Sequence, residues 1–496
     1  MRRIMDFGRL RIGLALAIAL AVPGGALAQG EVITKQYDDG SVYEGTFKDG
    51  VPDGTGTYRL PNGYEYSGEW VAGQIMGQGR ARFANGAVYE GAFVAGKQEG
   101  KGKITFADGG SYEGDWIAGK RTGQGKATYA GGTVYEGGFL DGRRHGTGVL
   151  TDGRGYRYEG DWVEDRKEGK GKITWADGAT YEGDLKADER DGQGTLIMPD
   201  GLTYVGQWAG GQINGQGKLT QPSGDVYEGP FADGLREGEG KVTYAAGGVY
   251  QGGFKADKRH GKGSYTEEGG ASYTGDWVEG RMEGQGRMTY ADGSVYEGAF
   301  RADQPEGQGR ITYPDGTFYE GDWKAGAMTG QGRATYEGGA SYEGALVDGK
   351  PEGRGVMTYA DGYRYEGDWK AGQREGQGAA TWADGTTYAG GFKAGLRDGK
   401  GDLKQPDGFT YSGDWKAGEM EGQGTATYPS GDIYVGGFVK GKREGAGKLT
   451  YKSGEVSEGI WRAGVLTGPL PAAPEGEAPA GEAAPAEGAA APAEGN

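Results

Sequence analysis

The sequence predicts an all-β fold: an elongated, twisted single-layer antiparallel β-sheet, a solenoid-like ribbon of 23-residue β-hairpin repeats. Tyr recurs every 23 residues from Tyr43 to Tyr434, eighteen times without an insertion, and Ser457 takes the nineteenth position. Gly stands two residues after each of these nineteen positions, from Gly45 to Gly459. Apolar and polar residues alternate around them, which is typical of strands with one buried face.

One repeat illustrates the predicted hairpin. Tyr112, Gly114 and Trp116 alternate with polar residues and predict the first strand. We expect a turn through residues 118–123 and a second strand through 124–129, with Gly125, Ala127 and Tyr129 on one face. Many repeats then carry Asp-Gly, a strong hairpin signal because such turns need positive φ. Each repeat is therefore expected to supply two antiparallel strands and two turns.

The strand glycines have a predicted packing role. Gly inside a strand normally weakens it, but Gly45 and its equivalents lie between two large aromatic positions. We expect the neighbouring rings to cover the bare backbone and so to form the core of a nearly single-layered sheet. One hairpin buries too little to fold alone, so neighbouring repeats are required.

Longer periods are superimposed on the repeat. Trp and Phe mostly alternate four residues after the repeated Tyr, with one break at Phe231 and Phe254. Residues 155–162 recur unchanged at 362–369, an offset of 207 residues or nine repeats. We infer a duplicated block, with repeats 1–9 at 43–249 and repeats 10–19, the second copy plus a closing repeat, at 250–468.

The two ends differ from the repeats. Residues 1–28 combine a basic start, a short apolar run and an Ala-x-Ala site, which predicts a signal peptide cleaved near Ala28/Gln29 and an exported, periplasmic or extracellular protein. A retained membrane anchor is the rival interpretation. Residues 29–42 are expected to add an N-terminal cap strand. Residues 469–496 are rich in Pro, Ala, Glu and Gly, which predicts a disordered tail.

Composition excludes several kinds of site. The chain has no Cys and a net charge of −17, which argues against thiolate chemistry and against nucleic-acid binding. His145 and His260 lie five repeats apart and are expected to be turn residues. The many carboxylates recur along one polar face and lack the uniqueness of a catalytic pair. We therefore expect no enzyme activity, catalytic residue, metal, cofactor or small-molecule substrate.

A family resemblance follows from these motifs. Tyr-Glu-Gly-Asp-Trp-Lys-Ala-Gly at 365–372, Glu-Gly-Gln-Gly at 375–378 and Ala-Asp-Gly at 383–385 resemble the MORN (membrane occupation and recognition nexus) repeat. The resemblance extends from about residue 40 to 468. It implies a scaffold; some such arrays dimerise, and some are proposed to bind anionic phospholipids.

The sequence points to one candidate binding feature. Basic residues recur eight to ten residues after the repeated Tyr and are expected to lie in turns along one edge. The residues predicted to form a partner- or anion-binding edge are Lys120, Arg121, Arg143, Arg144, Arg166, Lys167, Lys258, Arg259, Lys442 and Arg443. The favoured function is a non-catalytic scaffold for protein–protein interaction or self-assembly in the cell envelope. The alternative is peripheral binding of anionic lipid or envelope polysaccharide through this edge.

Overall fold

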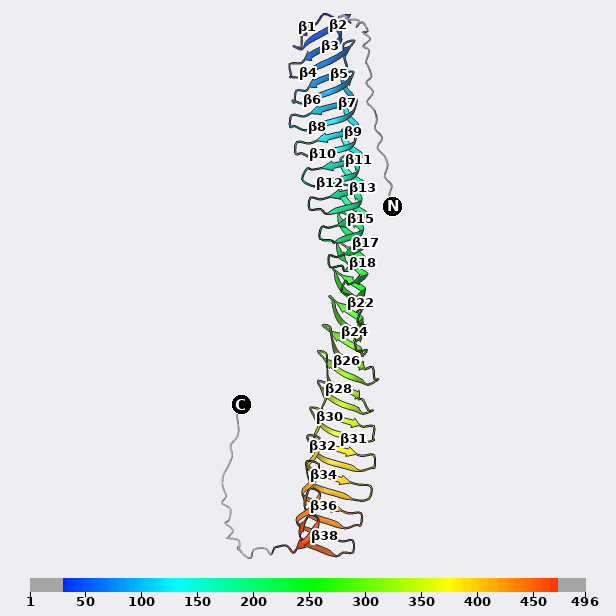
Figure 1. Cartoon of the computed structure of the whole chain (residues 1–496), viewed down its shortest axis with the longest axis vertical. Coiled ribbons are helices and arrows are strands. Elements are labelled where there is room, and N and C mark those ends of the chain that lie inside the picture. Colours follow the sequence, from blue (N-terminus) through cyan, green and yellow to red (C-terminus); the bar gives the residue numbers. More distant parts are fainter. Residues whose placement is uncertain (1–29, 472–496) are drawn as a thin grey trace, which may run out of the picture. The chain divides into compact units, whose positions relative to one another are not determined.

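The computed structural model describes residues 30–471, so the predicted signal peptide and most of the predicted tail lie outside it. The chain forms two compact units, one ending at Leu235 and one starting at Arg236. Within each unit the described residues form strands and no helix, and successive strands pair antiparallel in chain order (Figure 1). This confirms the predicted all-β fold of hairpin repeats.

The strands of each unit follow the 23-residue period. The first unit contains β1 (Ile33–Gln36), β2 (Val42–Lys48), β3 (Val51–Arg59), β4 (Glu65–Val71), β5 (Gln74–Arg82), β6 (Val88–Val94), β7 (Lys97–Thr105), β8 (Ser111–Ile117), β9 (Lys120–Thr128), β10 (Val134–Leu140), β11 (Arg143–Thr151), β12 (Arg157–Val163), β13 (Arg166–Thr174), β14 (Thr180–Lys186), β15 (Glu189–Ile197), β16 (Thr203–Ala209), β17 (Gln212–Thr220) and β18 (Val226–Ala232). The short β19 (Leu235–Arg236) contains the division between the units. The second unit contains β20 (Gly238–Thr243), β21 (Val249–Lys255), β22 (Lys258–Thr266), β23 (Ser272–Val278), β24 (Arg281–Thr289), β25 (Val295–Arg301), β26 (Gln304–Thr312), β27 (Phe318–Lys324), β28 (Ala327–Thr335), β29 (Ser341–Val347), β30 (Lys350–Thr358), β31 (Arg364–Lys370), β32 (Gln373–Thr381), β33 (Thr387–Lys393), β34 (Leu396–Lys404), β35 (Thr410–Lys416), β36 (Glu419–Thr427), β37 (Ile433–Val439), β38 (Lys442–Thr450), β39 (Val456–Arg462) and β40 (Val465–Gly468).

The turn inside each hairpin is shorter than the sequence suggested. Positions are counted from the repeated Tyr as 0. In the Tyr112 repeat only Ala118 and Gly119, at +6 and +7, form the turn; their φ values of 50° and 87° fit a two-residue type I′ hairpin. The second strand starts at Lys120, so the expected turn through 118–123 was wrong. Gly123, with φ 95°, belongs to a β-bulge, where the register shifts between the Gly114 and Trp116 pairs.

The second turn of each repeat closes on its own backbone, and in many repeats an Asp side chain adds a further hydrogen bond. After β7, the Phe106 amide donates to the Gly110 carbonyl at 2.8 Å, and the Gly109 amide donates to Phe106 at 3.1 Å. The Asp108 carboxylate accepts the Gly110 amide at 2.9 Å. The Asp residues of this edge therefore stabilise their own loops.

The core is a row of aromatic rings in edge-to-face contact. Tyr112 packs at 5.4 Å against Trp116 of its own strand and at 4.9 Å against Phe139 of the next repeat, both nearly perpendicular. The Tyr112 hydroxyl donates to the Asp115 carbonyl at 2.9 Å, and Trp116 Nε1 donates to the Gly102 carbonyl at 3.1 Å. The geometry recurs through most repeats, so each hairpin is fixed by rings of its neighbours.

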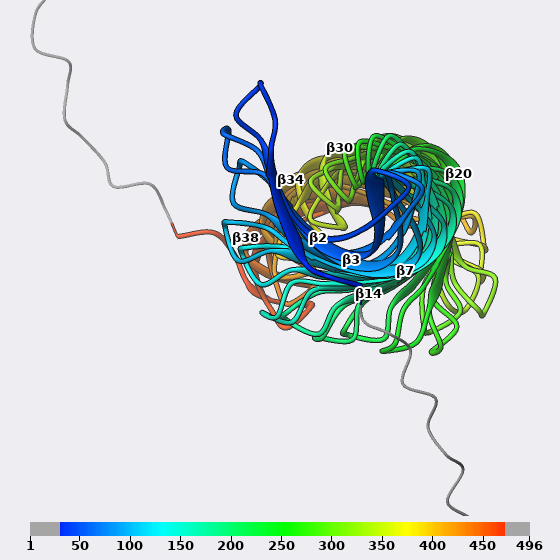
Figure 2. The ribbon, with the colours of Figure 1, turned by 90° about the horizontal axis from the view of Figure 1, so that it is seen from above.

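Two glycines of each repeat make room for the buried Tyr. A Cβ on Gly125 would lie 2.4 Å from Tyr112 Cε2, and one on Gly114 would lie 2.5 Å from the Gly125 Cα. The Tyr112 ring therefore rests on the +13 glycine. The +2 glycine, which the sequence suggested for this role, meets that side chain only at its hydroxyl, 2.6 Å from the added Cβ, and mainly allows the close approach of the neighbouring strand. Within each unit the successive hairpins are rotated relative to one another, as the twist of β-strands requires (Figure 2).

Candidate interaction surfaces

The +8 members of the predicted basic edge are exposed strand residues next to the +6/+7 turn. Several form ion pairs with an acidic residue in the turn of the following repeat: Lys120 with Asp141 at 3.2 Å, Arg143 with Glu164 at 3.0 Å, and Lys258 with Glu279 at 3.4 Å. Arg166 and Lys442 occupy the same exposed strand position. Because acidic partners accompany many of these cations, the edge carries little unbalanced positive charge.

The +9 members are half-buried and packed against rings. The guanidinium carbons of Arg144, Arg259 and Arg443 lie 4.1, 4.1 and 4.2 Å from the centres of tryptophan rings in the following repeat. Arg121 donates to the Gly142 carbonyl at 2.8 Å, and Lys167 lies 5.6 Å from the Tyr158 ring. These five cations contribute to the stability of the array. Their charge alone suggested a binding role, although the constant spacing between +9 and the next +4 ring was a signal for this packing.

The structure brings only part of the predicted edge together. Lys120 to Lys167 belong to three consecutive repeats of the first unit. Lys258 and Lys442, in the second unit, are eight repeats apart. At +10, Glu99 accepts a hydrogen bond from the Ala118 amide at 2.8 Å, and Glu168 accepts one from the Ala187 amide at 2.9 Å. Each bond joins one repeat to the turn of the following repeat. These carboxylates also have a structural role.

The carboxylates at +3 have partners as well. Asp115 accepts the Gln124 amide at 2.9 Å across the bulge and pairs with Lys101 at 2.6 Å. The Lys101 ammonium and this amide lower the pKa of Asp115 below its ordinary value. Within residues 30–471, no group of three or more His, Cys, Asp or Glu side chains is arranged to hold a metal ion. His145 and His260 lie within β11 and β22 and not in turns.

A groove with a glycine floor opens on the face opposite the aromatic row. At several junctions between repeats this face carries a cross-strand ion pair between +14 and the next +1, such as Lys103–Glu113 at 3.6 Å and Arg310–Glu320 at 3.1 Å. Between β32 and β37 the facing residues at these positions are not oppositely charged and form no ion pair. These are Ala379 opposite Ala389, Asp402 opposite Ser412, and Thr425 opposite Val435.

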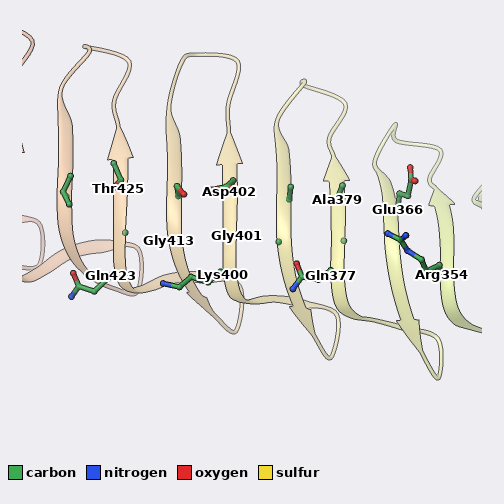
Figure 3. Close-up of a pocket in the computed structure, with 16 residues that line it drawn as sticks. Arg354, Glu366, Gln377, Ala379, Lys400, Gly401, Asp402, Gly413, Gln423 and Thr425 are labelled. Carbon is green, nitrogen blue, oxygen red and sulfur yellow. The ribbon is translucent and has the colours of Figure 1, made fainter. Parts of the chain in front are cut away.

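The groove has a volume of about 850 Å³. Figure 3 shows Gln377, Lys400 and Gln423 in a row on one side of the glycines, with Ala379, Asp402 and Thr425 on the other. Lys400 is held by Asp414 at 2.6 Å. Carboxamide and ammonium groups beside open backbone can hydrogen-bond an extended polar chain, but they do not form a catalytic constellation.

A row of exposed apolar side chains lies at +5 in the first unit. We call it the apolar stripe: Val71, Val94, Ile117, Leu140 and Val163, the last residues of β4, β6, β8, β10 and β12. Their exposed fractions are 54, 48, 54, 48 and 44%. Single exposed apolar residues are ordinary, but five in consecutive repeats form a continuous feature. In the sequence these residues look like ordinary members of the alternating strand pattern, and only the structure shows that they are exposed.

The same position differs in the second unit. There Lys or Arg stands at +5 in seven repeats, among them Lys370, Lys393 and Lys416 in three consecutive repeats. These lysines are exposed last residues of β31, β33 and β35. The +5 position therefore accepts a charged side chain without loss of the strand, and folding does not require the apolar stripe.

Comparison with known proteins supports the fold assignment. The MORN repeat matches eighteen segments, the first at 43–63 and the last at 434–456. Alsin of Rattus norvegicus is 45% identical over 49 residues, which is 9% of this chain and 3% of Alsin.

The solved structures found by comparison have low TM-scores and low sequence identities. The Drosophila melanogaster SAS-4 TCP domain, in complex with a proline-rich motif of Ana2, has a TM-score of 0.19 and 14% identity over 42% of this chain and 96% of that chain. The TCP10 domain of Danio rerio CPAP, in complex with a STIL peptide, has a TM-score of 0.15 and 14% identity over 59% and 99%. The eighteen matched segments cover most of residues 43–456, and this chain belongs to the MORN repeat family.

Proposed function

We propose that the chain is a non-catalytic scaffold that holds a protein partner against the apolar stripe of its first unit, and that it works in the cell envelope. MORN repeats mediate protein or membrane interaction and are generally non-catalytic. The envelope location rests on the basic start, apolar run and Ala-x-Ala site in residues 1–28.

The apolar stripe carries the proposal. Each repeat adds two strands, so successive stripe residues are about 10 Å apart and the five span about 40 Å. Burying five half-exposed aliphatic side chains removes apolar surface from water, and this favours association. Because lysine occupies the same position in the second unit, the stripe is best explained by a partner and not by the needs of the hairpin.

The test changes the stripe while keeping the fold. In the mature full-length chain, Val94→Lys, Ile117→Lys and Leu140→Lys are introduced together. The matched control introduces Val278→Lys, Val347→Lys and Val439→Lys, three exposed valines at +5 that are not in consecutive repeats. A photo-crosslinking residue at Val71 then reports contacts in the native envelope.

We expect the parent chain and the control to form the same crosslinked protein complex and the stripe variant to lose it. Light scattering of the purified chains then shows whether the partner is a second copy of this chain. If it is, the parent and the control self-associate and the stripe variant stays monomeric; if the partner is a different protein, all three purified chains are monomeric. Equal crosslinking of all three chains would contradict the proposal.

A second candidate function, peripheral binding of an anionic surface, rests on a row of exposed lysines. The exposed Lys370, Lys393 and Lys416 form a basic row in the second unit, whereas many cations of the predicted edge are paired or packed. Such a row could bind an anionic lipid or polysaccharide surface. Sedimentation with anionic vesicles should then fall as salt rises, and Lys370→Gln, Lys393→Gln and Lys416→Gln together should abolish it. Binding that persists in this variant would exclude the basic row.

A further inference from the structure

A hollow of about 570 Å³ lies on the aromatic face of the second unit, between the repeats that start at Tyr319 and Tyr342. Its walls include Tyr319, Met328, Ala334, Tyr336 and Leu346. Leu346 stands at +4, where nearly all repeats carry Phe or Trp, and Ala334 is the small residue at +15 beside it. The row of rings is therefore interrupted at this place.

The repeat two periods later shows what normally fills this space. Forty-six residues on, Tyr363 packs at 5.2 Å against the ring of Trp382, the counterpart of Tyr336. The Arg374 guanidinium lies 5.5 Å from the Tyr363 ring and donates a hydrogen bond to its hydroxyl. A phenol ring and a cation thus occupy the positions that Thr317 and Met328 hold beside the hollow.

Other repeats with Ala at +15 support the comparison. Tyr64 packs against Phe83 at 5.8 Å beside Ala81, and Phe409 packs against Tyr428 at 5.7 Å beside Ala426. In the repeat of Ala127, Gly110 stands two residues before the repeated Tyr, so no ring packs there. Tyr129, the counterpart of Phe83 and Tyr428, is then 41% exposed. An aromatic ring two residues before the repeated Tyr is thus the usual companion of a small +15 residue, and the Tyr319 repeat lacks it.

A polar atom in the hollow also lacks a partner. Among residues 30–471, the buried Tyr336 hydroxyl has no hydrogen-bond partner. Burying a hydroxyl without a partner is unfavourable, so a ligand that hydrogen-bonds to it recovers that loss. Asp315 and Glu337 also line the hollow. Hydrogen bonds from Thr317 hold the pKa of Asp315 below its ordinary value, so the site carries negative charge at neutral pH.

We propose that this hollow binds a cationic aryl group: a flat aromatic ring against Tyr336, carrying an amidinium, guanidinium or ammonium group. The ring takes the place that Tyr363 holds in the later repeat, and the cation takes the place of Arg374. The Tyr336 hydroxyl accepts a hydrogen bond from the cation, and the acidic residues favour its charge. The site is separate from the apolar stripe, so either can fail without the other.

The experiment titrates the mature full-length chain with benzamidine by calorimetry and by ligand-observed NMR. Benzoate has the same ring with the opposite charge and is the ligand control. Tyrosyl-arginine amide tests whether the cationic aryl group comes from a peptide, whereas benzamidine represents a free small molecule. We expect saturable binding of benzamidine at one site and no binding of benzoate. Tighter binding of the dipeptide would identify a peptide as the source.

Two variants locate the binding. Thr317→Tyr with Met328→Arg fills the hollow as the later repeat does, and should weaken benzamidine binding at least tenfold without lowering the melting temperature. Thr133→Tyr places the same side chain at the same repeat position in the first unit and should leave binding unchanged. Tyr336→Phe should weaken binding while raising the melting temperature of the free protein, because it removes an unpartnered hydroxyl. No saturable binding, or equal binding by the filled variant, would overturn the proposal.

Discussion

The guanidinium carbon of Arg144 lies 4.1 Å from the centre of the Trp162 ring, and Arg144 Nη2 donates to the Asp165 carbonyl at 2.8 Å. One side chain thus contacts both the core ring and the turn of the following repeat. Equivalent contacts join Arg190 to Trp208 and Arg397 to Trp415. An arginine that the sequence suggested as a binding residue is therefore part of the interface between repeats.

Arg144→Ala should destabilise β11 and β12 by about 1 kcal/mol or somewhat more, since it removes a cation–π contact and a charged hydrogen bond. Hydrogen exchange of these two strands measures the effect. Arg143→Ala, at the exposed neighbouring position, should change it by less than about 0.5 kcal/mol. Equal effects of the two substitutions would contradict the assigned packing role.

Gly125→Ala should destabilise its hairpin by about 1–3 kcal/mol, because the new Cβ would lie 2.4 Å from the buried Tyr112 ring. Gly131→Ala is the matched control, since no atom lies within 4 Å of its added Cβ. Thermal and chemical denaturation of both variants should show a loss for the first only. A Gly125→Ala protein as stable as the parent would mean that the ring does not rest on this glycine.

Alkaline pH should unfold the array above pH 10. Burial raises the pKa of Tyr112 and of Tyr135 to about 12, against 10.0 for a free Tyr. The folded state therefore holds protons that the unfolded state has lost, and its stability falls as pH rises from 10 towards 12. Tyrosinate absorbance at about 295 nm and circular dichroism should change together. Ionisation of these tyrosines near pH 10 with an intact sheet would be inconsistent with their burial.

Restoring an ion pair in the groove should stabilise the sheet slightly. Ala379→Lys with Ala389→Glu recreates the cross-strand pair of other repeats, worth about 0.2–1 kcal/mol at low salt and less at high salt. Ala379→Lys with Ala389→Lys is the control and should be destabilising, because like charges then face each other. Denaturation midpoints at two salt concentrations compare the variants. Identical midpoints would show that the two positions do not interact.

The repeat could be predicted because its signal is local and repeated. Tyr112, Gly114 and Trp116 alternate with polar residues on one strand. The same pattern recurs every 23 residues so many times that it cannot have arisen by chance. The length of the +6/+7 turn was missed because Gly123 resembles a turn residue in sequence. Only the register of β8 against β9 shows that it forms a bulge.

The sequence by itself determined the all-β hairpin array, since strand alternation, turn glycines and buried rings are properties of single repeats. The tertiary structure decided which charged and apolar side chains are exposed to solvent and which are packed against the next repeat. Arg121 and Arg144 are engaged because the next repeat places a ring and a carbonyl beside them, whereas Ile117 and Leu140 stay exposed because nothing within their unit covers them. Such contacts join residues about twenty positions apart, and their outcome depends on how neighbouring hairpins pack.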